Sequence, residues 1–270
     1  MTRREQIQFL TEKLLKDMPQ YRSETARFPD DDAEQRRLLR SLMNVRPPLP
    51  LDADFLHVQD ELLSAETAEK GVVQPQDLES AGNPRIFLWQ GDITRLGADA
   101  VVNAANSALL GCFIPCHGCI DNAIHSAAGL QLRDECARLM RVQGYEEPVG
   151  RARITGAYNL PARFVIHTVG PAAAGSVGRR ERQELRSCYE SCLVLAAEHG
   201  LKSIAFCCIS TGEFHFPNEE AAGIAVTAVQ DYLKREQNGI KVIFNVYKDI
   251  DCRIYRKLLP ADCVYDERNL

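Results

Sequence analysis

The stretch DAVVNAANSALLGCFIPCHGCIDNAIHSAAG, residues 99–129, holds the pattern that decides the fold. It begins with an apolar segment, DAVVNAAN at 99–106, that predicts a strand. A loop rich in cysteine follows, and IDNAIHSAAGLQLRDECARL at 120–139 has the apolar spacing of a helix. A strand, a loop with chemically reactive side chains and a helix, in this order, indicate one unit of an α/β fold.

The same alternation continues on both sides of this stretch, and it divides the chain into two parts. We expect residues 85–270 to form an α/β domain whose mostly parallel sheet is covered by helices on both faces. We expect residues 1–84 to form a separate helical region that either packs on this domain or recognises a partner or substrate. The other expected strands are 85–93, 152–160, 163–171, 202–210 and 241–247, and the other expected helices are 182–200, 218–236 with Asn218 as its cap, and 250–259.

The composition is that of a protein with a buried core, with 45% hydrophobic and 26% charged residues. A net charge of −5 argues against a general affinity for nucleic acid. No apolar run reaches the roughly 18–20 residues that span a bilayer, and the amino-terminal residues lack a secretory signal. We therefore expect a cytoplasmic monomer with no membrane contact, whose ten cysteines are thiols or metal ligands and not disulfides.

The cysteine-rich loop is the most unusual feature of the chain. Cys112, Cys116, His117 and Cys119 lie within eight positions, and sulfur and imidazole are the ligands that zinc prefers. Cys116 and His117 are neighbours that tend to point apart, so three of the four are expected to meet at one metal ion. Three ligands leave one coordination position open, as in catalytic zinc sites. A closed structural zinc site, a redox pair and free thiols are the alternatives.

Three further loops follow expected strands, where ligands of α/β folds bind. GDIT at 91–94 offers the Asp92 carboxylate to a ligand, or uses it as a helix cap. NAAN at 103–106 offers two asparagines to sugar hydroxyls, or forms a turn. ISTGEFHFP at 209–217 offers backbone N–H groups to a phosphate and two phenylalanines, Phe214 and Phe216, to a ring or to the core.

Taken together, these loops resemble those of the macrodomain family, which binds ADP-ribose. GDIT, NAANSALLG, CIDNAIHSAAG, RFVIHTVGP and ISTGEFHFP occur in the order of that family, over residues 85–259. Most hydrolytic macrodomains carry a glycine run followed by Val-Asp where this chain has CFIPCHGCID. The replacement resembles the zinc-dependent class with the motif GCFxPxHxCIDNxIH, which this chain matches at every fixed position. The helical region 1–84 also resembles the extension of that class.

The resemblance implies a three-layer α/β/α sandwich and a role for each loop. Asp92 and Ile93 would bind the adenine, the 210–214 loop would wrap the diphosphate, and zinc would be the cofactor. Asp121 and Asn106 would be the catalytic residues, and a structural hydrogen bond is expected for His125. The implied ligand-binding residues are Asp92, Ile93, Asn103, Asn106, Ser210, Thr211, Gly212, Glu213, Phe214 and Phe216, and the implied zinc ligands are Cys112, His117 and Cys119.

The activity that the resemblance implies is removal of mono-ADP-ribose from protein side chains, with Asp and Glu as the expected sites of modification. It also implies a sirtuin-like ADP-ribosyltransferase that adds the group and a lipoylated carrier protein as substrate. Zinc would either hold the ribose or polarise a water. Three alternatives remain open: a module that binds ADP-ribose without cutting it, a hydrolase of acetylated ADP-ribose, and an interaction protein with a structural zinc.

Overall fold

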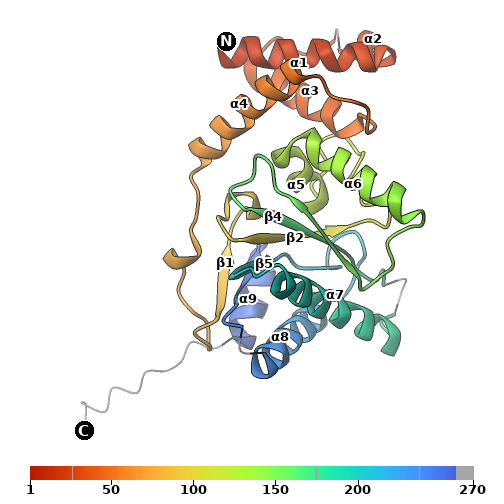
Figure 1. Ribbon diagram of the computed structural model, residues 1–270. Coiled ribbons are helices and arrows are strands. Elements are labelled where there is room, and N and C mark those ends of the chain that lie inside the picture. The colour runs from red at the N-terminus through yellow and green to blue at the C-terminus, as the bar shows by residue number, and fades with distance from the viewer. Residues whose placement is uncertain (26, 174–175, 237, 260–270) are drawn as a thin grey trace.

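The computed structural model describes residues 1–259 apart from residues 26, 174–175 and 237. Residues 260–270, the end of the expected second domain, lie outside the described part. A central sheet lies between two layers of helices, and the helices of the amino-terminal part stack on one of these layers (Figure 1). Within the described residues, no helix is long and apolar enough to cross a membrane.

The sheet is the six-stranded, mostly parallel mixed sheet that the alternation predicts, with strand order β1-β6-β5-β2-β4-β3. All neighbouring strands are parallel except β3 and β4, which are antiparallel. Its central strands are apolar runs buried on both faces, as parallel strands under two helical layers require. The strands are β1 (Ile86–Gln90), β2 (Ala100–Ala105), β3 (Ala152–Gly156), β4 (Phe164–Val169), β5 (Ser203–Phe206) and β6 (Lys241–Val246).

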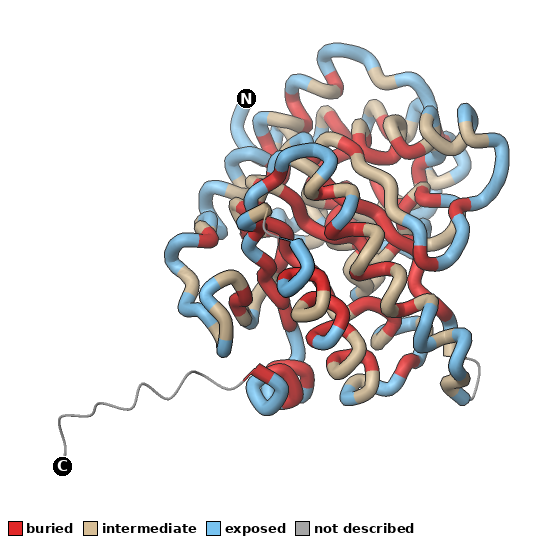
Figure 2. The backbone as a smooth tube through the Cα atoms, turned by 60° about the horizontal axis from the view of Figure 1, so that its bottom comes forward, coloured by how far each residue is buried: buried red, intermediate tan, exposed pale blue. Residues whose placement is uncertain are grey.

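The helices cover the two faces of this sheet unequally. One face is covered by α5 and α6, and the other by α7, α8 and α9 (Figure 1). The central strands and the inward sides of the helices are buried, and exposed residues lie mostly on the outward sides of the helices and in surface loops (Figure 2). The α-helices are α1 (Arg3–Asp17), α2 (Arg22–Thr25), α3 (Asp32–Val45), α4 (Ala53–Lys70), α5 (Ile120–Ala128), α6 (Leu130–Gln143), α7 (Arg179–Glu198), α8 (Asn218–Arg235) and α9 (Asp249–Leu258), and the 3-10 turns are η1 (Pro19–Tyr21), η2 (Pro75–Asp77) and η3 (Ile93–Arg95).

Two sequence-based expectations about helices are wrong in detail. The expected helix 120–139 is broken at Gly129, whose φ of 95° a residue with a side chain rarely adopts. The break lets α6 leave in a new direction, and the Gln59 side chain accepts from the freed Leu130 N–H at 2.9 Å. The cap of α8 is Pro217 and not Asn218. Asn218 is the first helical residue, and its amide donates to Asp251 at 2.6 Å.

The amino-terminal helices have a small hydrophobic core of their own. The apolar stripe of α1, which includes Leu10 and Leu14, packs against α3 and α4, and Leu130 of α6 joins the same cluster. A capping box between Thr2 and Glu5 begins α1. The helical region is therefore a packed unit that also contacts the sheet-covering layer.

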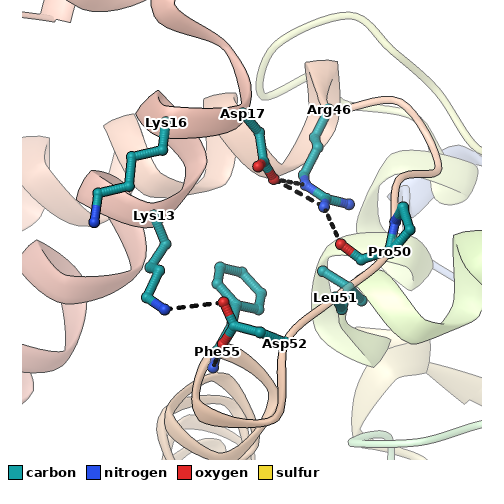
Figure 3. Close-up of a pocket in the computed structure, with 8 residues that line it drawn as sticks. All are labelled: Lys13, Lys16, Asp17, Arg46, Pro50, Leu51, Asp52 and Phe55. Atoms are coloured by element: carbon teal, nitrogen blue, oxygen red, sulfur yellow. Dashed lines mark hydrogen bonds and ion pairs between the residues drawn. The ribbon is translucent and has the colours of Figure 1, made fainter.

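The turn between α3 and α4 is organised by one buried cation. Arg46 is only 2% exposed, and its guanidinium donates to Asp17 at 2.9 Å and to the Pro50 carbonyl at 3.1 Å (Figure 3). It also donates to the Leu49 carbonyl at 3.1 Å. Beside it, Lys13 donates to Asp52, the residue that caps α4 (Figure 3). The RPPLP segment breaks the helix as expected, and Arg46 satisfies the carbonyls that the break leaves without helical partners.

Candidate functional site

The candidate site lies at one edge of the sheet. Because β1, β2 and β5 run in the same direction, their carboxyl ends meet at this edge. The loops that follow them are residues 91–94, 106–119 and 207–217, which are the loops singled out in the sequence. The structure thus brings together segments that lie more than 100 residues apart in the chain.

The loop between β2 and α5, residues 106–119, brings three candidate metal ligands together, and we name it the metal loop. Ligand atoms of Cys112, His117 and Cys119 all lie within 4.8 Å of one another, and Cys112 Sγ is 3.7 Å from His117 Nδ1. In a tetrahedral zinc site, bonds of about 2.0–2.3 Å place donor atoms about 3.3–3.8 Å apart. Two sulfurs and one imidazole nitrogen at these distances fit zinc after a small contraction of the loop.

Cys116, the fourth candidate ligand, faces away from this group. Its φ of 49° turns the side chain toward α3, where Sγ lies 3.2 Å from Ser41 Oγ and 3.5 Å from the Arg37 carbonyl oxygen. The Cys116 N–H donates to Asn44 Oδ1 at 2.9 Å. Neighbouring Cys116 and His117 therefore face opposite sides of the loop, as the sequence predicts.

Electrostatics keep the Cys119 sulfur protonated when no cation lies beside it. Burial is the main cause that raises the pKa of Cys119 to about 12; the adjacent Cys112 acts in the same direction, and the N–H of Asn122 acts against it. Cys119 also caps α5, where its sulfur accepts from that N–H at 3.4 Å. A bound cation is the ordinary way in which proteins hold such thiols as thiolates.

Asp121 lies in the first turn of α5, two residues beyond Cys119, and is only 6% exposed. Its carboxylate accepts from Asn103 Nδ2 at 2.8 Å and from Asn106 Nδ2 at 3.4 Å. Burial raises the pKa of Asp121 to about 6, against the opposing hydrogen bond from Asn103. The structure thus brings the two asparagines of NAAN and Asp121 together beside the three metal-ligand side chains.

Each of the two asparagines makes a further contact, besides the one with Asp121, that the sequence alone did not predict. Asn106 Oδ1 accepts from the Ala108 N–H at 3.1 Å, so this residue builds a turn and also contacts Asp121. Asn103 Nδ2 lies 3.2 Å from His167 Nδ1, and Asn103 Oδ1 is buried with no hydrogen-bond partner among the described residues. Asn103 therefore bridges Asp121 and a buried histidine of β4.

Two buried histidines lie behind Asp121, and the sequence assigned a site role to neither. His167 lies 3.0 Å from Thr155 Oγ1, and burial lowers its pKa to about 4. Burial and the nearby His167 hold the pKa of His125 well below its usual range. His125 Nε2 is 3.5 Å from Asp121 Oδ1, but neither ring nitrogen of His125 has a hydrogen-bond partner among the described residues, so the structural hydrogen bond expected for His125 is not found there. Both rings are neutral at physiological pH.

The loop after β5 presents backbone N–H groups at the same edge. Ser210 has a φ of 66°, and its carbonyl accepts from the Phe216 N–H at 2.9 Å. The N–H groups of Gly212, Glu213 and Phe214 make no hydrogen bond to the described residues. Such free N–H groups are suited to phosphate oxygens. Phe216 is 1% exposed and belongs to the hydrophobic core, and the ligand contact expected for it stays a prediction.

The loop after β5 also meets the loop that carries the metal ligands. Glu213 Oε1 lies 3.6 Å from His117 Nε2, because the strands before these two loops, β5 and β2, are neighbours in the sheet. At the far end of the edge, Asp92 caps η3 through Thr94, whose N–H donates to Asp92 Oδ1 at 3.0 Å. The other carboxylate oxygen lies 3.9 Å from Lys70 Nζ. Asp92 therefore caps η3 with Oδ1, and its Oδ2 takes no part in the cap.

Residues of the amino-terminal helices support the metal loop, and sequence reasoning missed them. Arg40 donates to Asn122 Oδ1 at 2.7 Å, and Asn44 donates to Ser126 at 2.9 Å. Arg133 of α6 donates to the Leu110 carbonyl at 2.7 Å and lies over the Phe113 ring, 4.4 Å from its centroid. The sequence did contain a signal for these contacts, because the polar residues Arg40 and Asn44 lie among the apolar residues of α3.

This arrangement provides the parts that recognition and cleavage of a nucleotide sugar require. It combines three soft donor atoms, one buried carboxylate held by amides and a loop with free N–H groups. The groups available to a ligand along this edge include Asp92 Oδ2 at one end and the N–H groups of residues 212–214 at the other.

Comparison with known protein families agrees with this geometry. The family described as Macro domain matches residues 102–225. A protein of Treponema medium named protein-ADP-ribose hydrolase is 49% identical over 262 residues, which cover 96% of this chain and 100% of that protein. A protein of the same name from Staphylococcus aureus (strain MSSA476) is 46% identical over 254 residues, which cover 93% of this chain and 95% of that protein.

Solved structures show the same fold. The Oceanobacillus iheyensis macrodomain, solved with ADP, is 36% identical with a TM-score of 0.59, and the match covers 64% of this chain and 88% of that one. The Trypanosoma brucei macrodomain, solved in complex with ADP-ribose, is 30% identical with a TM-score of 0.63, and the match covers 81% of this chain and 94% of that one. The sheet, its helical layers and these relatives agree, and the chain belongs to the macrodomain family.

Proposed function

We propose that this chain hydrolyses the bond between ADP-ribose and a modified protein side chain, with zinc held by Cys112, His117 and Cys119. The observation that carries the proposal is the position of Asp121, a buried carboxylate fixed by two asparagine amides directly beside the three donor side chains. Two relatives named protein-ADP-ribose hydrolases, which match this chain over nearly its full length, support the activity.

The binding half of the proposal uses the edge of the sheet. Asp92 accepts from the amino group of the adenine with the carboxylate oxygen that the η3 cap leaves free, and Ile93 lies beside it. The diphosphate takes the free N–H groups of the loop that contains Gly212 and Glu213. The distal ribose then lies near Asn103 and Asn106. The solved relatives with ADP and ADP-ribose support this class of ligand.

The catalytic half uses Asp121. Its carboxylate is oriented by Asn103 and Asn106, and it accepts a proton from a water that attacks the anomeric carbon of the ribose. The water oxygen forms the new bond to that carbon, and the bond from the carbon to the side-chain oxygen of the protein breaks. When the modified residue is Asp or Glu, the freed side chain leaves as a carboxylate. Cys112, His117 and Cys119 would hold the zinc, which would supply Lewis-acid chemistry next to Asp121.

Replacing Asp121 tests the proposal. An auto-ADP-ribosylated acceptor protein is incubated with wild type or Asp121→Asn, and the released ADP-ribose is counted. We expect the rate to fall by about 100-fold or more, because asparagine keeps the shape of the side chain but cannot accept the proton. Calorimetry should show that both proteins still bind free ADP-ribose.

Two results would contradict the proposal. If wild type binds ADP-ribose tightly but releases none from any acceptor, the protein is a module that binds the modification without cutting it. Wild type that deacetylates acetylated ADP-ribose and leaves every modified protein intact is a metabolite hydrolase. An Asp121→Asn variant with full activity would remove Asp121 from the chemistry while leaving the hydrolysis itself in place.

A further inference from the structure

A groove of about 690 Å³ lies between the amino-terminal helices and the metal loop. It is lined from α1, α3 and the end of α4, and Cys116 of the metal loop forms part of its wall. Cys116 is the neighbour of the candidate ligand His117, and it faces this groove while His117 faces the site. The groove therefore begins where the candidate site ends.

Positive charge is in excess in this groove. Its lining contains five cationic side chains and two carboxylates, Glu66 and Glu69. Arg36 forms a two-bonded pair with Glu66 at 2.5 and 2.8 Å, and Arg3 pairs with Glu69 at 2.6 Å. The two carboxylates are thereby neutralised within the lining.

The remaining cations are Arg37, Arg40 and Lys70. Arg40 donates to the neutral Asn122, and its Nε is buried without a hydrogen-bond partner among the described residues. Arg37 is 63% exposed and pairs with Glu34 at 3.4 Å, and Lys70 lies 3.9 Å from Asp92, but both of these carboxylates lie outside the groove lining. The lining itself therefore carries more cations than carboxylates in a chain whose net charge is −5. Local excess of one sign against an opposite overall charge is typical of a recognition surface.

We propose that this groove, which we name the basic groove, binds an acidic segment of the modified protein next to its ADP-ribosylated residue. The inference rests on the proposed function, because a chain attached to the distal ribose leaves the site beside the metal loop. Its volume exceeds the need of a single phosphate and suits a short peptide. The overall negative charge disfavours a long polyanion such as RNA, which would meet repulsion beyond the groove.

The test compares two ADP-ribosylated peptides with the same linkage. In one, acidic residues flank the modified position, and in the other these residues are Gln and Asn. We expect wild type to have about fivefold higher kcat/KM for the acidic peptide, an advantage that shrinks as salt is raised. Arg37→Glu should abolish the preference, mainly through KM. Arg37 is chosen because its side chain is exposed and only its backbone carbonyl contacts Cys116.

The matched control is Arg22→Glu, which makes the same charge change on α2, outside the groove. It should keep the preference of wild type. Equal kcat/KM for the two peptides in wild type, or an equal loss in both variants, would overturn the inference. So would inhibition by an oligonucleotide at the same concentration as the unmodified acidic peptide, because the surface would then be a general polyanion site.

Binding of the unmodified acidic peptide, followed by fluorescence anisotropy, separates the two proposals. If Arg37→Glu weakens binding of the free peptide and neither modified peptide is hydrolysed, the proposed function is overturned and peptide binding in the basic groove is supported. Hydrolysis that ignores the flanking charges, together with no binding of the free peptide, would support the proposed function and overturn the groove.

Discussion

The sheet region and the amino-terminal helices are held together in different ways. The core of the sheet region extends over both faces of the sheet and includes fully buried residues from the central strands, such as Val102, Ile204 and Ile243. The core of the helices is small and includes Leu130 from the sheet region. The strands fix their loops through backbone pairing, which no single side chain controls.

The helices, in contrast, hold the metal loop through individual polar side chains. Asn44 contacts Cys116 and Ser126, and Arg133 bonds the carbonyls of Met43 and Arg46 across the boundary. The metal loop therefore belongs to both regions: the sheet fixes its ends, and the helices fix the shape of its middle. Substitutions can therefore change one contribution without the other.

The largest expected effect is that of Arg133→Met, which cuts the link between the regions. The Arg133 side chain is buried and donates to the carbonyls of Leu110, Met43 and Arg46. Burial lowers its pKa to about 10, so it stays charged at neutral pH. Loss of these bonds leaves buried carbonyls without partners, and we expect the free energy of unfolding in urea to fall by about 3 kcal/mol.

Arg141→Met is the matched control, because Arg141 is exposed on the same helix. It should change the free energy of unfolding by less than about 0.5 kcal/mol. If both variants were equally stable, the two regions would not depend on Arg133 for their connection.

A smaller effect, confined to the metal loop, is expected for Asn44→Ala. This change removes the acceptor for the Cys116 N–H and the donor to Ser126 while the helix core stays intact. Residues that hold the ligands of a metal site in place typically affect its affinity, so we expect zinc to bind about tenfold more weakly. Competition with a chelating dye measures this. Gln6→Ala, which removes an exposed amide contact to Glu61 on the same helical region, should leave the zinc affinity unchanged.

The smallest effect belongs to the sheet region alone. Asp99, just before β2, accepts from the N–H groups of Lys202 and Ser203 and pairs with Arg163 at 3.0 Å. Burial acts to raise its pKa, but these hydrogen bonds and the guanidinium together hold it below the ordinary value of 3.8. The stabilisation is therefore complete above that value and is lost as the pH falls through the lower pKa of the folded state.

Asp99→Asn should lower the free energy of unfolding by about 1 kcal/mol at neutral pH. The difference from wild type should shrink as the pH falls below 4, and the zinc affinity should not change. A loss of zinc affinity equal to that of Asn44→Ala would break the comparison, because Asp99 lies at the opposite end of β2 from the metal loop.

Much of the fold follows from the sequence because each strand carries its own local signal. The apolar runs around Val102 and Ile204 predict buried strands, and the change of spacing after residue 119 predicts α5. The break at Gly129 was missed because the apolar spacing continues through it and only the backbone angle changes. Local patterns carry no information about the direction of a helix after such a break.

The candidate site also has a part that the sequence predicts and a part that it does not. The loops that hold Asn103, Asp121 and the metal-ligand side chains are predictable, since each follows a strand directly. The contact of Arg40 with Asn122 joins residues 82 positions apart, and that of Asn103 with His167 joins residues 64 positions apart. Such contacts depend on how helices and strands pack in three dimensions, which no local pattern encodes.

The proposed hydrolysis of ADP-ribosylated protein depends on zinc bound by the metal loop. The most direct test measures zinc per chain and ADP-ribose release from a modified acceptor on one sample, before and after a strong chelator and again after zinc is restored. We predict about one zinc ion per chain, release that stops when zinc is removed, and release that returns with zinc. Full release from a sample without zinc would contradict the claim.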